Sequence, residues 1–384
     1  MAGGLRTAGQ AARRVRRGLA GSRGGRGLVL GAVAGAAAFV VSEAARPRGG
    51  RGRLLDWDEI AELARSRLGA SEDMSSAAAA RTTELYRKLA AEVESPLLET
   101  LGGLPDRARL PRFDVLGRRA WVDLNVRILR RATEPLFETH AGSVPNTLLV
   151  DLGRAGVDRY VAFLLGYLAR RVLGQYDPQL LGREPIGADG LYLVEPNVAA
   201  WEERADLPPA QLRRWLILHE MTHAWQFAAH PWLRGHMDSM LRELMALGEA
   251  RDDPLSRVLS MTVGLRSQWR VARRIQAVMS LVEGYGNLAM NLVGRRLLPD
   301  FDRLETAYRE RGDHRKPLEI LLFKVTGLGL KMQQYEVGER FARTVLEAHG
   351  MAALNRAWSG PEALPTIEEL GDPEAWYRRT SGTA

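Results

Sequence analysis

The stretch from Leu216 to Phe227, LILHEMTHAWQF, carries the most specific signal in this chain of 384 residues. It holds two histidines, His219 and His223, four positions apart, and Glu220 directly follows the first of them. On a helix, side chains four residues apart lie one turn above each other on the same face, so both imidazoles can bind one zinc ion. The intervening glutamate then faces the water that the zinc activates. The spacing is typical of a zinc hydrolase.

The residues around this motif predict a buried helix. Asp206 is suited to cap its start, the prolines at 208 and 209 suit a first helical turn, and Pro231 ends it. Apolar side chains lie on nearly every face of the predicted helix. Two histidines and a glutamate in such a helix are costly to bury unless a partner compensates them, and a metal ion is the simplest partner. The alternative is a chance match of the motif.

A hydrolytic zinc site needs a third protein ligand. A histidine six residues after His223 would supply it in one zincin arrangement, but that position is Ala229. His230 lies roughly 10 Å along the helix axis from His223, too far to share a metal, and it is expected to face the negative end of the helix dipole. The better candidate is Glu283, which falls within an apolar helical pattern and needs a buried partner.

The neighbours of Glu283 add two expectations and one alternative. Gly284 and Gly286 lower helix stability, which predicts that a second helix approaches closely here. Asn287, one turn after Glu283, is predicted to orient a ligand histidine through its second ring nitrogen. In the alternative, Glu283 pairs with a buried arginine at position 273 or 274 and has a purely structural role.

Composition limits the kind of metal site and the kind of partner. The chain has no cysteine, so it can form neither disulfides nor thiolate sites, and a zinc ion must be held by His, Asp or Glu. A reducing cytoplasm is the default compartment. Of the net charge of +8, residues 1–53 carry eleven arginines against the single acid Glu43, whereas the other 43 basic and 45 acidic residues nearly cancel. Nucleic-acid binding is therefore rejected as the main function.

Residues 1–53 form a separate segment rich in glycine, alanine and arginine, with one uncharged apolar run between Gly27 and Ser42. The run is shorter than the ~20 residues that span a bilayer, and arginines flank it on both sides. Three interpretations remain open: a disordered basic tail, a short membrane anchor, or a secretory signal. The first is favoured, with weak attraction to anionic lipid, so the chain is expected to be cytoplasmic and in part membrane-associated.

The remaining residues predict a mainly helical protein with a small β element. Apolar spacing with period 3.6 predicts helices over Trp57–Leu68, Ala77–Val93, Arg118–Leu129, Val161–Leu173 and Leu318–Leu346. The clearest strand candidate, Gly190–Val194, precedes the metal helix and is expected to offer its edge to a peptide substrate or to form a structural hairpin. The polar stretch Pro299–Pro317 is expected to be a loop.

Several separate blocks in the same order resemble an actinobacterial zincin-like family of zinc-dependent metalloproteases and hydrolases, some members of which are labelled as associated with deazaflavin-cofactor biosynthesis. The resemblance runs from about Leu54 to Arg378. The blocks that carry it are Trp121–Asn125, Arg171–Asp177, Val194–Asn197, Trp215–Phe227, Pro231–Leu233, Glu283–Gly284, Lys331, Gln334–Tyr335, Gly338, Phe341 and Leu364–Thr366.

The resemblance implies a zincin-like metalloprotease fold over residues 54–384, with a helical N-terminal part, 54–145, and a metal-site part, 146–384. It implies His219, His223 and Glu283 as zinc ligands and Glu220 as the catalytic acid/base. The chain departs from the family pattern after Glu283, where Tyr285 and an asparagine at 287 replace a histidine and an acidic group. An asparagine cannot raise the basicity of a ligand imidazole as a carboxylate would, so reduced activity is one expectation.

Two functional hypotheses follow. The first is a zinc-dependent metallopeptidase or related amide hydrolase acting on a peptide or protein, in which Glu220 moves the proton and Tyr285 or Tyr335 stabilises the oxyanion. The second is a catalytically weak zincin-fold binding or scaffolding protein, held at a membrane by residues 1–53. A role in cofactor biosynthesis is a third interpretation, and it rests on family labels.

Overall fold

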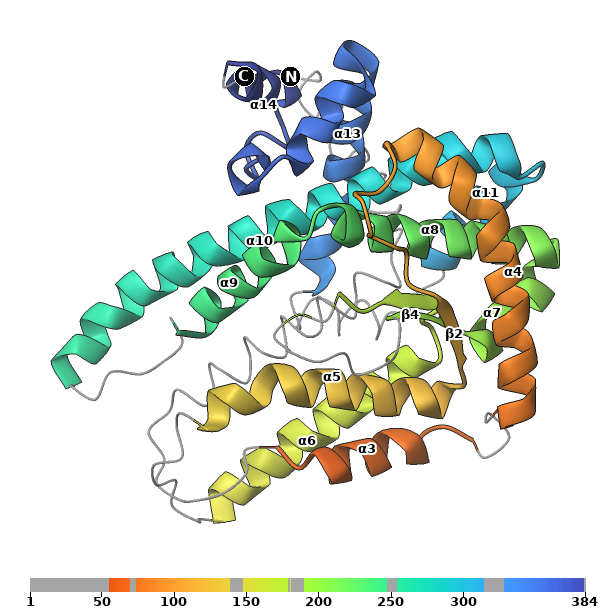
Figure 1. The fold of residues 1–384 in the computed structure, drawn as a ribbon. Helices are drawn as coiled ribbons and strands as arrows, with labels where there is room; N and C mark the ends of the chain where they lie inside the picture. Colours follow the sequence, from red (N-terminus) through yellow and green to blue (C-terminus); the bar gives the residue numbers. More distant parts are fainter. Residues whose placement is uncertain are drawn as a thin grey trace, which may run out of the picture.

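The computed structural model describes residues 55–69, 74–138, 148–178, 180, 190–246, 254–313 and 328–382. Two groups of helices enclose a small sheet (Figure 1). The first half of the chain contains α3 (Trp57–Ser66), α4 (Ser76–Leu101), β2 (Phe113–Leu116), α5 (Arg118–Glu138), α6 (Leu148–Ala169), β3 (Gly174–Tyr176), β4 (Leu191–Val194) and α7 (Glu195–Ala205).

In the second half, the described residues form helices joined by turns and contain no strand. Its elements are α8 (Pro209–Ala229), α9 (Trp232–Ala246), α10 (Pro254–Leu297), α11 (Phe301–Asp313), α13 (Leu328–Asn355, with a break in helical geometry at Gly350), the 3-10 turns Arg356–Trp358 and Pro361–Ala363, and α14 (Pro373–Ser381). The described residues thus form the mainly helical fold with a small β element that the sequence predicts.

The sheet has the strand order β2-β4-β3, so β4 lies in the middle. It pairs in parallel with β2, with Phe113 opposite Leu191, and antiparallel with β3, with Gly174 opposite Leu193. Successive side chains of a strand point to opposite faces. One face of the sheet joins the core of α4, α8 and α10, and the other packs toward α3, α5 and α6.

The central position of β4 corrects one prediction. The segment Gly190–Val194 does form a strand, as expected, but both of its edges are taken by β2 and β3. It therefore has no edge to offer to a peptide. Among the described strands, β3 is the one at the edge of the sheet nearest to α8.

Helix α8 runs through the centre of the larger core, between α4 and α10 (Figure 1). Every residue from Trp215 to Phe227 is buried, which agrees with a helix that is apolar on nearly all faces. Its start differs from the expectation. Pro208 is the N-terminal cap, whereas Asp206 has a left-handed backbone conformation and ends α7 instead.

One further sequence expectation is changed by the structure. The stretch expected to be a loop, Pro299–Pro317, contains the helix α11, whose polar composition reflects an exposed face rather than irregular structure. Leu304 in this helix is buried in the larger core.

The apolar run from Gly27 to Ser42 lies outside the described residues. No helix within the described residues is long and apolar enough to cross a bilayer.

A buried ionic cluster joins α4, α7 and α8. Arg213 donates to Glu195 at 2.7 Å and also to Glu202, while the Tyr86 hydroxyl donates to the other oxygen of Glu195 at 2.6 Å. Burial and the Glu195 carboxylate raise the pKa of Tyr86, so this hydroxyl keeps its proton. The cluster fixes the start of α8 against both neighbouring helices.

Replacing Arg213 by methionine is expected to lower the free energy of unfolding by about 2 kcal/mol, because it leaves the Glu195 carboxylate buried without its cation. Urea denaturation followed by circular dichroism measures the change. Arg214→Met is the matched control, since Arg214 pairs with the more exposed Glu92 and a surface ion pair contributes at most about 1 kcal/mol. Equal losses in the two variants would contradict a stabilising role for the buried cluster.

Candidate metal centre

The two histidines of α8 point to a common position. His219 and His223 are buried, their rings meet edge to face at a centroid distance of 4.6 Å, and their Nε2 atoms lie 3.1 Å apart. The four-residue spacing on a regular helix places them one turn apart on one face. Two imidazole nitrogens therefore converge at a single point within the core.

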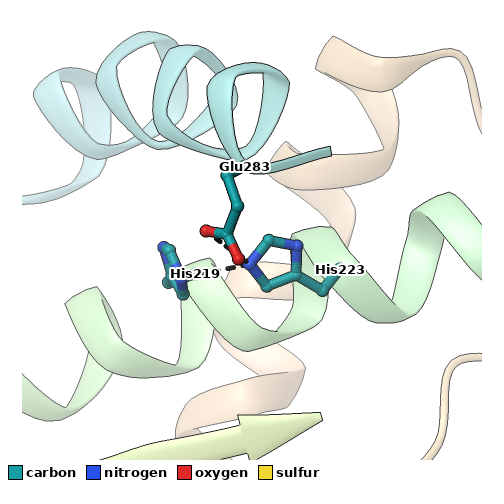
Figure 2. Close-up of side chains that lie close together, drawn as sticks. All are labelled: His219, His223 and Glu283. Atoms are coloured by element: carbon teal, nitrogen blue, oxygen red, sulfur yellow. Dashed lines mark hydrogen bonds and ion pairs between the residues drawn. The ribbon is translucent and has the colours of Figure 1, made fainter. Parts of the chain in front are cut away.

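Glu283 reaches the same point from α10 (Figure 2). Its Oε2 atom lies 3.7 Å from Nε2 of His223, and one donor atom from each of the three residues lies within 4.8 Å of the others. The side chain of Glu283 is 13% exposed. The structure thus brings together the three residues that the sequence singles out as metal ligands.

The donor set and its spacing fit zinc. Two ligand atoms bound at about 2.0–2.1 Å to a tetrahedral zinc ion lie about 3.3–3.4 Å from each other. The observed separations, 3.1 Å between the histidines and 3.7 Å between His223 and Glu283, fall on either side of that value. Two imidazoles and one carboxylate also form a common catalytic zinc set, which leaves one position for solvent or substrate.

The alternative partners of Glu283 are engaged elsewhere. Arg273 pairs with Glu368, and Arg274 pairs with Glu243 at 2.9 Å. Neither arginine forms an ion pair with Glu283, so the structural alternative raised by the sequence has no support in this arrangement.

Glycines let the backbones of α10 and α13 and the imidazole of His223 approach one another closely near the centre, as the sequence predicts for Gly284 and Gly286. A Cβ on Gly284 would overlap the backbone of Gly338 in α13, and a Cβ on Gly338 would overlap the carbonyl of Ser280 in α10. A Cβ on Gly286 would lie 3.1 Å from Cε1 of His223. The turn of α10 that carries Glu283 is therefore held between α13 and the imidazole of His223.

Glu220 lies under β3. It is buried, and a Cβ on Gly174 would come within 2.6 Å of its Oε1 atom. A residue with a side chain at position 174 would displace the carboxylate. Gly174 thus leaves the space that the predicted catalytic acid/base occupies, next to the edge strand of the sheet.

Other residues take the role predicted for Asn287. The Nδ1 atom of His223 lies 3.0 Å from Oε1 of Gln226, and Nδ1 of His219 lies 2.8 Å from the sulfur of Met290. Among the described contacts, the side chain of Asn287 makes no hydrogen bond to either imidazole ring. The backbone carbonyl of Asn287 accepts a hydrogen bond from the side chain of Asn291. Asn287 is therefore not the group that orients a histidine.

Sequence reasoning missed Gln226, although a signal for it was present. It lies three residues after His223 on the same helix, so its amide comes beside the ring. An apolar helix gives a buried glutamine few other partners.

Tyr285, a predicted oxyanion partner, is a core residue in this structure. Its ring stacks on Trp225 at a centroid distance of 5.7 Å and meets Trp358 edge to face, while its hydroxyl donates to Asn355 at 2.8 Å. Burial raises its pKa well above the ordinary value. Two residues along a helix from Glu283, it points to a different face, which explains why the two side chains separate. The side chain of Tyr335 lies outside the described residues.

His230 ends α8 but does not act as a charged cap. It is packed between Trp225 and Trp358, and burial lowers its pKa to about 4. A neutral imidazole gains little from the negative end of the helix dipole. The expectation that it is a non-ligand residue at the helix end fits its position at the C-terminal cap.

The sequence profile of the zincin-like metallopeptidases matches residues 55–377, which include the whole cluster of His219, His223 and Glu283. The chain belongs to the zincin-like metallopeptidase family. A zincin-like chain is expected to bind zinc, in agreement with the donor set described above.

A solved structure supports the same assignment for this zincin-like protein. It is described as a candidate hydrolase with a novel fold from Chloroflexus aurantiacus and is 34% identical, with a TM-score of 0.66. The alignment covers 85% of the present chain and 99% of that chain. No curated protein matches the sequence. The family and the neighbouring structure together indicate a hydrolase at the level of the family.

Proposed function

We propose that this chain is a zinc-dependent metallopeptidase or a related amide hydrolase. The observation that carries the proposal is the convergence of His219, His223 and Glu283 on one point, with Glu220 in the same turn of α8. The donor atoms fit a single zinc ion, and family membership favours the same metal.

A bound zinc would act as a Lewis acid that polarises the substrate carbonyl and makes water a stronger nucleophile near neutral pH. His219, His223 and Glu283 would hold it. Glu220, directly after His219 in the sequence, would take the proton from the attacking water and deliver it to the leaving nitrogen. The missing side chain of Gly174 leaves room for this carboxylate, which supports the proposed role.

The free edge of β3 supports a peptide as the substrate. The backbone bonds from Val194 to Leu173 and from Asp177 to Gly190 fix the alternation of the antiparallel pair. Residues 173, 175 and 177 therefore face β4, while the N–H and C=O groups of Gly174 and Tyr176 point away from it. No described strand pairs with these groups. An extended peptide could add to this edge and lie next to Glu220.

Metal analysis tests the centre before any substrate is known. Purified wild-type protein is expected to bind about one zinc per chain, and His219→Ala and Glu283→Ala are expected to lose it while keeping their helical circular dichroism. His349→Ala is the matched control, because His349 also pairs with a carboxylate, Glu374 at 2.7 Å, but belongs to α13. Zinc retained by both cluster variants, or lost by the control, would refute the assigned site.

Hydrolysis is then tested with a broad peptide library, with cleavage detected by mass spectrometry. Zinc-loaded wild-type protein is expected to cleave a subset of peptides, and a chelator is expected to stop the cleavage until zinc is restored. A protein that binds zinc but cleaves nothing would favour the second hypothesis, a catalytically weak binding protein.

A further inference from the structure

A buried glutamine connects the two helices that carry the candidate ligands. Gln226 in α8 is fully buried. Its Oε1 atom lies 3.0 Å from Nδ1 of His223, and its Nε2 atom donates to the backbone carbonyl of Val282 at 2.9 Å. Val282 directly precedes Glu283 in α10, so one side chain touches both a ligand and the turn that holds another ligand.

The direction of these hydrogen bonds follows from chemistry. A backbone carbonyl only accepts, so the amide nitrogen of Gln226 must face Val282 and its oxygen must face His223. That oxygen also only accepts, so Nδ1 of His223 must carry the proton. In a neutral imidazole the lone pair then lies on Nε2, the atom 3.1 Å from Nε2 of His219 and 3.7 Å from Glu283.

The ring of His223 is also closely approached by α10. Gly286 lies one turn after Val282 on α10, and a Cβ there would come within 3.1 Å of the ring. The imidazole thus meets a glycine that leaves it space and an amide that fixes its protonated nitrogen. The glycine belongs to the turn of α10 that carries Glu283, and the amide comes from α8 but is bonded to the same turn through Val282.

We propose that Gln226 is a positioning residue that selects the zinc-binding tautomer of His223 and couples this choice to the placement of Glu283. This inference rests on the proposed function, because it assigns Gln226 a part in building the metal centre. The residue does not touch the metal or the substrate. It acts through His223 and through the backbone of Val282.

The test compares three variants in full-length protein. Gln226→Met has a similar length and removes both hydrogen bonds, while Gln226→Glu keeps an acceptor for Nδ1 of His223. Gln211→Met is the matched control. Gln211 lies near the start of the same helix and also makes two hydrogen bonds, both to Asp300, but it is about 18 Å from His223 along the axis at 1.5 Å per residue.

Zinc affinity, measured by competition with a chromophoric chelator, is expected to fall about 10- to 100-fold in Gln226→Met. It is expected to stay at the wild-type level in Gln211→Met. Nitrogen NMR of the zinc-free protein is expected to show His223 protonated at Nδ1 in the wild type and in Gln226→Glu, and a mixture of tautomers in Gln226→Met. Thermal unfolding shows whether each variant is folded.

Each outcome decides one claim. If wild-type and Gln226→Met bind zinc equally, or if the tautomer is the same in both, the role of Gln226 is refuted. If wild-type protein binds no zinc, the proposed function fails, and the tautomer spectra still decide about Gln226. If Gln226→Met does not fold, loss of the Nδ1-protonated tautomer in Gln226→Glu refutes the inference and its retention supports it.

Discussion

Replacing Glu220 by glutamine is expected to lower hydrolytic turnover about 10²- to 10⁴-fold while one zinc ion per chain remains bound. Glutamine has the same shape and fits the space under Gly174, so the buried surroundings of residue 220 are kept. It cannot accept the proton of the attacking water. The loss corresponds to about 3–5 kcal/mol of transition-state stabilisation. Cleavage rates on the peptides found in the library screen, measured beside zinc content, give the result.

Glu243→Gln is the control for this variant. It removes one carboxylate from α9, where Glu243 pairs with Arg274 on the surface, and it is expected to leave turnover unchanged. A Glu220→Gln protein as active as the wild type would refute the role of Glu220 as acid/base. A variant that loses zinc as well as activity would show that Glu220 supports the metal centre itself.

Replacing Gly338 by alanine is expected to lower the free energy of unfolding by about 3 kcal/mol and to weaken zinc binding. An alanine in a helix normally stabilises it by about 0.5–1 kcal/mol relative to glycine. Here the added Cβ would overlap the carbonyl of Ser280, so α10 and α13 must separate. The turn carrying Glu283 would then move away from the histidines. Urea denaturation and zinc competition measure the two effects.

Gly235→Ala provides the comparison, because a Cβ at this exposed position of α9 meets nothing within 4 Å. It is expected to be neutral or slightly stabilising. If Gly338→Ala is as stable as Gly235→Ala and binds zinc normally, the close crossing of α10 and α13 does not position Glu283.

The candidate site was largely predictable because its geometry is local. His219, Glu220 and His223 share one helix, and a helix fixes their relative placement from spacing alone. Glu283 was predictable for a different reason, since a carboxylate in an apolar pattern requires a buried partner. The structure brings His219, His223 and Glu283 together as the sequence suggests.

The contacts that depend on tertiary packing were not predictable. The bond from Gln226 to Val282, and the lack of a bond from Asn287 to His223 among the described contacts, depend on how α8 and α10 are rotated against each other. The same rotation turns Tyr285 toward Trp225 and Trp358. No spacing rule within one helix contains that information.

The small sheet shows the same limit. The strand β4 was predicted from its apolar residues and flanking turn signals, but β2 and β3 were not, because strands of three or four residues give too short a pattern. Strand order depends on pairing between distant segments, so the edge position was assigned to the wrong strand. The helix α11 was missed because an amphipathic helix with a mostly polar surface resembles a loop in composition.

The separation of the ligands along the chain has a consequence for how the protein matures. His219 and His223 leave the ribosome together, but Glu283 is synthesised sixty residues later, and the turn that carries it crosses α13, which follows later still. A nascent chain therefore has an incomplete set of donors until residue 283 of 384 has been made. We therefore expect stable metal capture to follow the docking of α10, and a chain that ends before Glu283 would lack the third donor.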